Sequence, residues 1–252
     1  MSWALRITTI TAAIAVVSGL SASHVTAQSS GAPDECGTAL VLALDISYSV
    51  DEEEQIMQTH GLAAALLSPD VQSAILGPAG PVTMAAFTWG GFWDHRLVAD
   101  WTLLDSEAAI ERFALRLKAV APDYALRPTA LGSALRFASE LHRRNPYDCY
   151  NKVVDVSGDG VTNEGVWPSY HRENGTLAGL TINGLVIRNE KPDPLPHYLE
   201  EVIQGPGAFV IDINDYGDYL RAMREKLIRE LSLHLSKRAV EQHETALRAQ
   251  AD

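Results

Sequence analysis

The sequence predicts an α/β fold with a doubly wound, mostly parallel central sheet, one antiparallel edge strand and helices on both faces. The first observation is the unbroken apolar run at 40–44, which is typical of a strand buried on both faces. The second is the alternation of strand and helix patterns, which predicts right-handed crossovers between parallel strands. The third is a pair of strand patterns at 81–89 and 96–103 around Gly90-Gly91, which predicts an antiparallel edge hairpin.

The other elements follow from caps, periodicity and chain breakers. A helix is expected after Val50, because the acidic run Asp51-Glu-Glu-Glu suits the positive end of a helix dipole, and Ser68-Pro69 ends it. We interpret these acids as a solvated first turn rather than as metal ligands. The segment 167–177 has a weak helical pattern that Asn174-Gly175 interrupts. Further helices are expected at 106–120, 130–143, 198–203 and 216–235, and further strands at 153–156, 181–187 and 208–213.

The first 27 residues have the pattern of a secretory signal peptide. Arg6 precedes a mostly apolar stretch at 7–20, and Val25-Thr26-Ala27 has the small residues of a cleavage site, so cleavage is expected near Ala27. A membrane anchor is the weaker alternative, because the apolar stretch is short and interrupted by Thr, Ser and Gly. We therefore expect an exported protein, periplasmic or extracellular, with no membrane span in the mature chain.

The rest of the chain has the length of one large domain. We expect a lead-in at 28–37, the α/β domain at 38–235 and a charged helical tail at 236–252. The formal net charge is −12, and the sequence contains no basic stretch. Such a chain is not expected to bind nucleic acid or an anionic membrane surface, but it is compatible with a site that collects cations.

The two cysteines, Cys36 and Cys149, are expected to form a disulfide, because an exported protein matures in an oxidising compartment. Cys36 precedes Asp45 by nine residues and Cys149 precedes Asp159 by ten. If the two strands are neighbours, both cysteines fall at the end of the sheet opposite these aspartates. Two separate buried thiols are the alternative.

Three oxygen-bearing side chains, Asp45, Ser47 and Ser49, follow the apolar run at every second position. They come just after a buried strand, where open α/β sheets bind ligands. Carboxylate and hydroxyl oxygens suit magnesium, calcium or manganese rather than zinc or copper. These three ligands alone make a weak site, so other loops must complete it. The alternative is that the two serines only cap the following helix.

Two later segments supply further oxygens. Thr129 lies in the loop before an amphipathic helix, and Asp159 follows the apolar strand at 153–156 and precedes a glycine. The set Asp-x-Ser-x-Ser, a later Thr and an Asp-Gly after another strand resembles the metal-ion-dependent adhesion site of von Willebrand factor A domains. The resemblance covers roughly residues 38–231. Val-Ser-Gly-Asp-Gly at 156–160 and Thr-Ile-Asn-Gly-Leu at 181–185 also resemble a secreted bacterial branch of that superfamily, domain-of-unknown-function family 1194.

The resemblance implies a role for each of these positions. Ser47, Ser49 and Thr129 would bind a divalent cation through their hydroxyls. Asp45 and Asp159 would hold it from further out, through water molecules. Magnesium is the expected ion, with manganese or calcium as alternatives. An unidentified partner protein would present an Asp or Glu carboxylate to the open position on the cation.

The rim of this site would decide which partner fits. The expected rim residues are Tyr48, Trp89, Glu164 and Trp167. The protein is then a binding module rather than an enzyme, because the partner is held by a metal bridge and is not chemically changed.

Two other functions are open. A hydrolase could use Ser47 or Ser157 as nucleophile, or a water activated by the metal, but the sequence has no Gly-x-Ser-x-Gly elbow and its histidines are scattered. A structural A-like domain could keep the site pattern and act through another face or through its C-terminal helix. Substitution of Thr129 distinguishes this last alternative, because partner binding would then survive the change.

Overall fold

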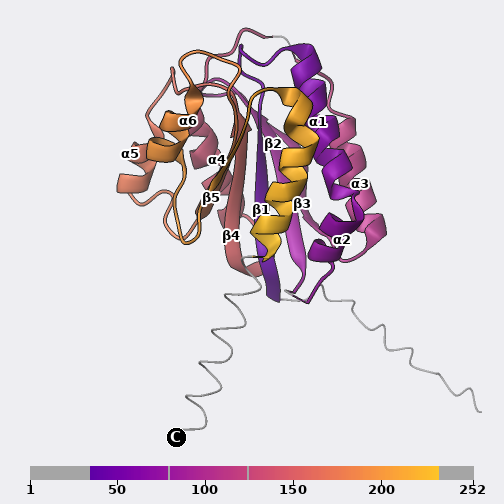
Figure 1. Cartoon of the computed structure of the whole chain (residues 1–252). Helices are drawn as coiled ribbons and strands as arrows, with labels where there is room; N and C mark the ends of the chain where they lie inside the picture. Colours follow the sequence, from indigo (N-terminus) through magenta and orange to yellow (C-terminus); the bar gives the residue numbers. More distant parts are fainter. Residues whose placement is uncertain (1–34, 79, 124, 233–252) are drawn as a thin grey trace, which may run out of the picture. The chain divides into compact units, whose positions relative to one another are not determined.

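A six-stranded sheet with the order β3-β2-β1-β4-β5-β6 forms the centre of the computed structural model, which describes residues 35–78, 80–123 and 125–232 (Figure 1). The strand β3 runs antiparallel to β2, and every other neighbouring pair is parallel. The predicted sheet and its antiparallel edge are therefore confirmed. The strands are β1 (Glu35–Asp45), β2 (Val82–Trp89), β3 (His95–Leu103), β4 (Asp148–Gly158), β5 (Thr181–Ile187) and β6 (Val210–Ile213).

Helices cover both faces of this sheet (Figure 1). One face packs against α1, α2, α3 and a helix over 219–232, and the other against α4, α6 and the π-helical turn after it. The helical elements are α1 (Glu52–Leu66), α2 (Pro69–Ile75), α3 (Glu107–Lys118), α4 (Leu131–Arg143), α5 (Pro168–Glu173), α6 (Pro194–His197), the π-helical turn Tyr198–Val202 and the 3-10 turn Tyr216–Asp218.

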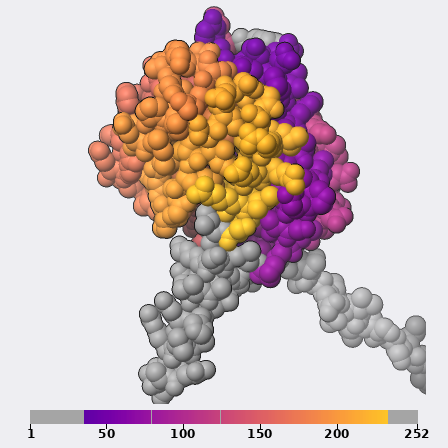
Figure 2. Space-filling view, in the orientation of Figure 1, coloured from indigo at the N-terminus to yellow at the C-terminus, as the bar shows by residue number. Residues whose placement is uncertain are grey.

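The central strand β1 shows why both faces must be covered. Its side chains alternate, so that Leu40 and Leu42 join the core under α1 and α3 while Val41 and Ala43 join the core under α4. All four are buried. The helix over 219–232 closes the first of these cores beside the N-terminal helices (Figure 2), where Arg224 pairs with Asp70 at 2.8 Å.

The acidic run after the first strand begins α1 as predicted. Asp51 is the N-cap: its side chain accepts from the Glu54 N–H, and the Glu54 carboxylate accepts from the Asp51 N–H, both at 2.9 Å. The predicted end at Ser68-Pro69 is only a break, however, because Pro69 starts α2. Proline is well tolerated at a first helical position, since the N–H it lacks has no partner there.

The predicted disulfide between Cys36 and Cys149 is confirmed. The two residues are paired in the β1–β4 register, with Cα atoms 4.4 Å apart, at the end of the sheet opposite Asp45 and Asp159. Because β1 already begins at Glu35, the last part of the predicted lead-in is strand rather than linker. The expected break at Asn174-Gly175 is also present, since α5 ends at Glu173 and Gly175 has φ +79°.

Other predicted boundaries lie outside the described residues. These are the signal peptide at 1–27, the first part of the lead-in and the tail at 236–252. In the part of the chain that the structure describes, no helix combines the length and apolarity needed to cross a membrane.

Candidate metal centre

Three loops meet at the carboxyl edge of the central strands. Asp45 ends β1, and Asp159 directly follows the last residue of β4. Because β1 and β4 are parallel neighbours, their ends lie side by side. The loop before α4 brings Thr129 to the same edge, where Tyr48 N–H donates to the Arg127 carbonyl at 2.8 Å. All five predicted ligand residues therefore lie in one cluster.

Hydrogen bonds tie this cluster together. Ser47 N–H donates to Asp45 Oδ1 at 2.7 Å, and the Ser49 hydroxyl donates to Asp159 Oδ1 at 2.5 Å. The hydroxyl oxygens of Ser47 and Ser49 are 3.4 Å apart. Thr129 is held by its backbone, because its N–H donates to Asn163 Oδ1 at 2.8 Å and its carbonyl accepts from Asn163 N–H at 2.9 Å. Asp51 caps α1, and no side chain caps α4, so none of the three hydroxyls has a role in capping these helices.

The two carboxylates are buried and have no cationic partner. Burial, followed by the charge of Asp159, raises the pKa of Asp45 well above its ordinary value. Burial also raises the pKa of Asp159 to about 7, with smaller contributions from Glu54 and Glu190. None of the ion pairs among the described residues includes Asp45 or Asp159. Their negative charge is therefore not compensated by a cationic side chain among the described residues.

The donor set fits a hard divalent cation. Each carboxylate has one oxygen, Asp45 Oδ2 or Asp159 Oδ2, that is buried and has no hydrogen-bond partner. Among the described residues, no group of three or more His, Cys, Asp and Glu side chains could hold a metal ion. The cluster contains only two such residues, and its other three side chains supply hydroxyl oxygens. Such an oxygen-only set suits magnesium, manganese or calcium.

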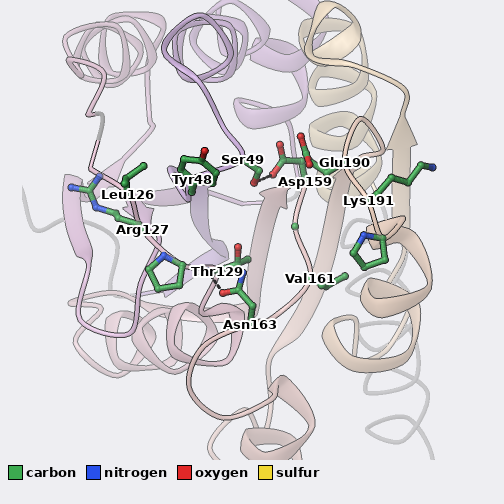
Figure 3. A pocket seen from close by; sticks show the side chains of 13 residues that line it. Tyr48, Ser49, Leu126, Arg127, Thr129, Asp159, Val161, Asn163, Glu190 and Lys191 are labelled. Atoms are coloured by element: carbon green, nitrogen blue, oxygen red, sulfur yellow. Dashed lines mark hydrogen bonds between the residues drawn. The ribbon is translucent and has the colours of Figure 1, made fainter.

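An open cavity of about 650 Å³ lies over the cluster (Figure 3). Tyr48 and Leu126 stand on one side of Ser49 and Asp159, and Lys191 stands on the other. The cavity is lined by Tyr48, Ser49, Leu126, Arg127, Pro128, Thr129, Asp159, Gly160, Val161, Asn163, Glu190, Lys191 and Pro192.

The predicted rim requires correction. Tyr48 lines the cavity and is 73% exposed, as a rim residue must be. The prediction for Trp89 is wrong, because this side chain is fully buried in the core under α4 and cannot contact a partner. Glu164 and Trp167 do not line the cavity. Glu164 instead accepts a hydrogen bond from the Phe92 N–H at 2.6 Å. Trp167, a few residues further along the chain, is exposed.

Sequence reasoning missed several residues of the site. Leu126 is 80% exposed, and an apolar residue in a loop between two prolines was a signal for it. Glu190 and Lys191 come from the loop after β5, and no pattern in the sequence links that loop to the site. Gln58 on α1 was also missed: its side chain accepts from Asp45 N–H at 3.1 Å and donates to the Asp45 carbonyl at 2.8 Å.

The alternative nucleophile Ser157 lies beneath the site rather than in it. It is fully buried, and its hydroxyl donates to Gln58 Oε1 at 2.7 Å and accepts from the Tyr219 hydroxyl at 3.1 Å. A buried hydroxyl engaged in this way supports the end of β1 and is not accessible to a substrate.

The strand order and the three loops at one sheet edge define a von Willebrand factor A-like α/β domain. The chain belongs to the family described as a protein of unknown function, DUF1194, whose model matches residues 35–235. No curated protein matches the sequence.

Solved structures share the fold. Proximal thread matrix protein 1 from the mussel byssus is 16% identical with a TM-score of 0.57, over 79% of this chain and 49% of that one. A von Willebrand factor type A protein from Catenulispora acidiphila is 18% identical with a TM-score of 0.52, over 77% and 42%. A structure of the mussel protein in which zinc occupies the metal-ion-dependent adhesion site (MIDAS) motif is 14% identical, with a TM-score of 0.54. The match covers 79% of this chain and 48% of that one. The chain thus spans about half the length of these proteins, and the likeness establishes the fold alone.

Proposed function

We propose that the protein is an exported binding module, in which a divalent cation held at the candidate metal centre bridges to a carboxylate of a partner protein. The observation that carries the proposal is the pair of buried carboxylates, Asp45 and Asp159, which have unpartnered oxygens and form no ion pair with any described residue. Burying charges without compensation is costly, so the arrangement favours a cation supplied from solution.

The chain's own groups divide the work of holding the ion. Ser47, Ser49 and Thr129 would supply neutral hydroxyl oxygens, and Asp45 and Asp159 would supply the negative charge. When bound, the cation would present positive charge to the cavity. Magnesium is the ion we expect, with manganese or calcium as alternatives. The zinc in the related mussel structure supports divalent-cation binding only in general.

The partner would be an Asp or Glu side chain presented by a protein. The cavity of about 650 Å³ is much larger than a carboxyl group, so residues beside the acid would also enter it. Tyr48 and Leu126 would contact an apolar neighbour of the acid, because both are largely exposed at the cavity wall. The disulfide and the predicted signal peptide support export.

Calorimetric titration of the metal-stripped protein with magnesium, manganese, calcium and zinc tests this function. Wild type should bind a divalent ion, and Asp45→Ala should not. Asp105→Ala, which removes an exposed aspartate outside the site, is the matched control and should bind like wild type. Failure of wild type to bind any of the four ions would refute the metal site.

A second variant addresses the partner. Thr129→Ala removes one hydroxyl from the cavity wall and should abolish capture of acidic peptides from a displayed random library in magnesium. Equal enrichment of acidic peptides by wild type and Thr129→Ala would instead favour a domain that acts through another face.

A further inference from the structure

Beneath the candidate metal centre, three groups surround the position that a side chain on Gly158 would take. A methyl group on this glycine would lie 2.5 Å from Asp45 Oδ2, 2.7 Å from Tyr198 Oη and 3.2 Å from Trp89 Cζ2. The carboxylate oxygen, the phenol hydroxyl and the indole ring therefore face the same space. It exists only because residue 158 has no side chain.

The polar groups around this space lack partners. Asp45 Oδ2, Tyr198 Oη and Trp89 Nε1 are all buried without a hydrogen bond among the described residues. Two are donors and one is an acceptor. A buried polar group usually has a hydrogen-bond partner, and a bond between the Tyr198 hydroxyl and Asp45 Oδ2 would supply one to each of them.

The position of Tyr198 is fixed by the turn that carries it and by the strand β5 that it packs against. It lies in the π-helical turn after α6 and is fully buried. Gly184 of β5 leaves room for its ring, since a methyl group there would lie 3.0 Å from Tyr198 Cδ1. Burial, together with the nearby charges of Asp45 and Asp159, raises the pKa of Tyr198, so its hydroxyl keeps its proton and is a donor.

We propose, on the basis of the function proposed above, that Tyr198 is a positioning residue of the metal centre whose hydroxyl donates to Asp45 Oδ2 when the centre holds its cation. Ser47 N–H already holds Oδ1, so the second hydrogen bond fixes the rotation of the carboxylate. Trp89 Nε1 is also buried without a partner among the described residues, on the ring whose Cζ2 lies next to the Gly158 position. Support of this kind typically changes metal affinity by about 10–100-fold.

Tyr198→Phe tests the proposal in the full-length protein, because it removes one oxygen atom and keeps the ring. We expect the affinity for Mn²⁺ and Mg²⁺ to fall about tenfold. The melting temperature of the metal-stripped variant should stay within about 2 °C of wild type, because the hydroxyl removed has no hydrogen-bond partner among the residues that the structure describes. A purely structural hydroxyl would lower the melting temperature and leave metal affinity unchanged.

Tyr219→Phe is the matched control. Tyr219 is equally buried, but its hydroxyl donates to Ser157 Oγ at 3.1 Å, so its removal should lower the melting temperature of the metal-stripped protein. An affinity of Tyr198→Phe within about twofold of wild type, or a melting temperature that falls as far as in Tyr219→Phe, overturns the positioning role. If wild type itself binds neither ion, the proposed function fails, and this role fails with it.

Discussion

The strand β4 and the residue that follows it carry two buried aspartates, and the protein treats their charges differently. Asp155 contacts the Lys226 ammonium at 2.7 Å, and the same ammonium bonds Glu230 Oε1 at 2.8 Å. Asn183 also donates to Glu230, at 2.8 Å. Asp159, four residues after Asp155, has a serine hydroxyl at 2.5 Å and no ion pair within the described part of the chain.

This difference distinguishes a structural cluster from a binding site. Asp155, Lys226 and Glu230 are all buried, and the cation is part of the chain, so the cluster fixes the helix over 219–232 on the sheet. Among the described residues, Asp45 and Asp159 have no ion pair. In the function proposed above, the cation would come from solution, and occupancy of that site would depend on the surroundings.

The largest expected effect breaks the structural cluster. Lys226→Met leaves Asp155 and Glu230 buried without a cation, and should lower the free energy of unfolding by about 3–5 kcal/mol, measured by urea denaturation. Arg221→Met is the control, since Arg221 is 63% exposed and its ion pairs are weak. A loss no larger than that of the control would show that Lys226 does not compensate these carboxylates.

A bound cation should stabilise the candidate metal centre, as Lys226 is expected to stabilise the cluster of Asp155 and Glu230. Magnesium at a hundredfold excess over its dissociation constant should raise the free energy of unfolding by about 2.7 kcal/mol. The measurement is urea denaturation with and without the ion. Asp45→Ala should gain nothing, and equal gains in both proteins would contradict a specific site.

The pH dependence of stability shows how completely Lys226 compensates Asp155. Burial raises the pKa of Asp155 from 3.8 to about 7, although Lys226 opposes the shift and Glu230 adds to it. Between these values Asp155 is more protonated in the folded protein than in the unfolded one, so its contribution to stability falls as the pH rises from 4 to 8. Asp155→Asn should remove about 4 kcal/mol of this dependence in urea denaturation of metal-free protein.

His142 changes the pH dependence of stability in the opposite sense. Burial lowers the pKa of His142 from 6.5 to about 4, so its contribution to stability is lost as the pH falls through this window. His142 is present in both proteins, so its effect cancels when Asp155→Asn is compared with wild type. Identical pH profiles of the two proteins would mean that Lys226 fully compensates Asp155.

The smallest expected effect on stability comes from a methyl group added at Gly158, under the metal centre. Gly158→Ala puts a methyl group 2.5 Å from Asp45 Oδ2 and should cost about 1–2 kcal/mol in urea denaturation. It should also abolish magnesium binding in calorimetry, because the carboxylate must turn. Gly61→Ala, whose shortest contact would be Tyr219 Cδ1 at 3.0 Å, is the control and should bind magnesium normally.

Much of this architecture was predictable because local patterns carry it. The apolar run at 40–44 and the hairpin at 81–103 predicted the centre and edge of the sheet. The spacing of Cys36 and Cys149 from the two strand ends predicted the disulfide. Parallel strands place their ends at one edge of a sheet, so we could predict that the candidate ligands lie close together. These are Asp45, Ser47, Ser49, Thr129 and Asp159. Their role as metal ligands stays a prediction.

Other features depended on which surfaces pack together. Trp89 ends a strand next to a glycine turn, and only the packing of α4 against that face buries it. Lys226 lies in a charged stretch that is typical of an exposed helix face, yet it is fully buried.

The sequence by itself determined the α/β fold, the strand ends that carry the oxygens and the pair of cysteines, because each follows from periodicity or spacing within a short segment. Only the tertiary structure decided that Asp155 pairs with Lys226 while Asp45 and Asp159 pair with no described cationic side chain, and that Tyr198 and Asp45 approach the same glycine. These contacts join residues far apart in the chain, from elements whose relative rotation and register are fixed by packing and not by local sequence.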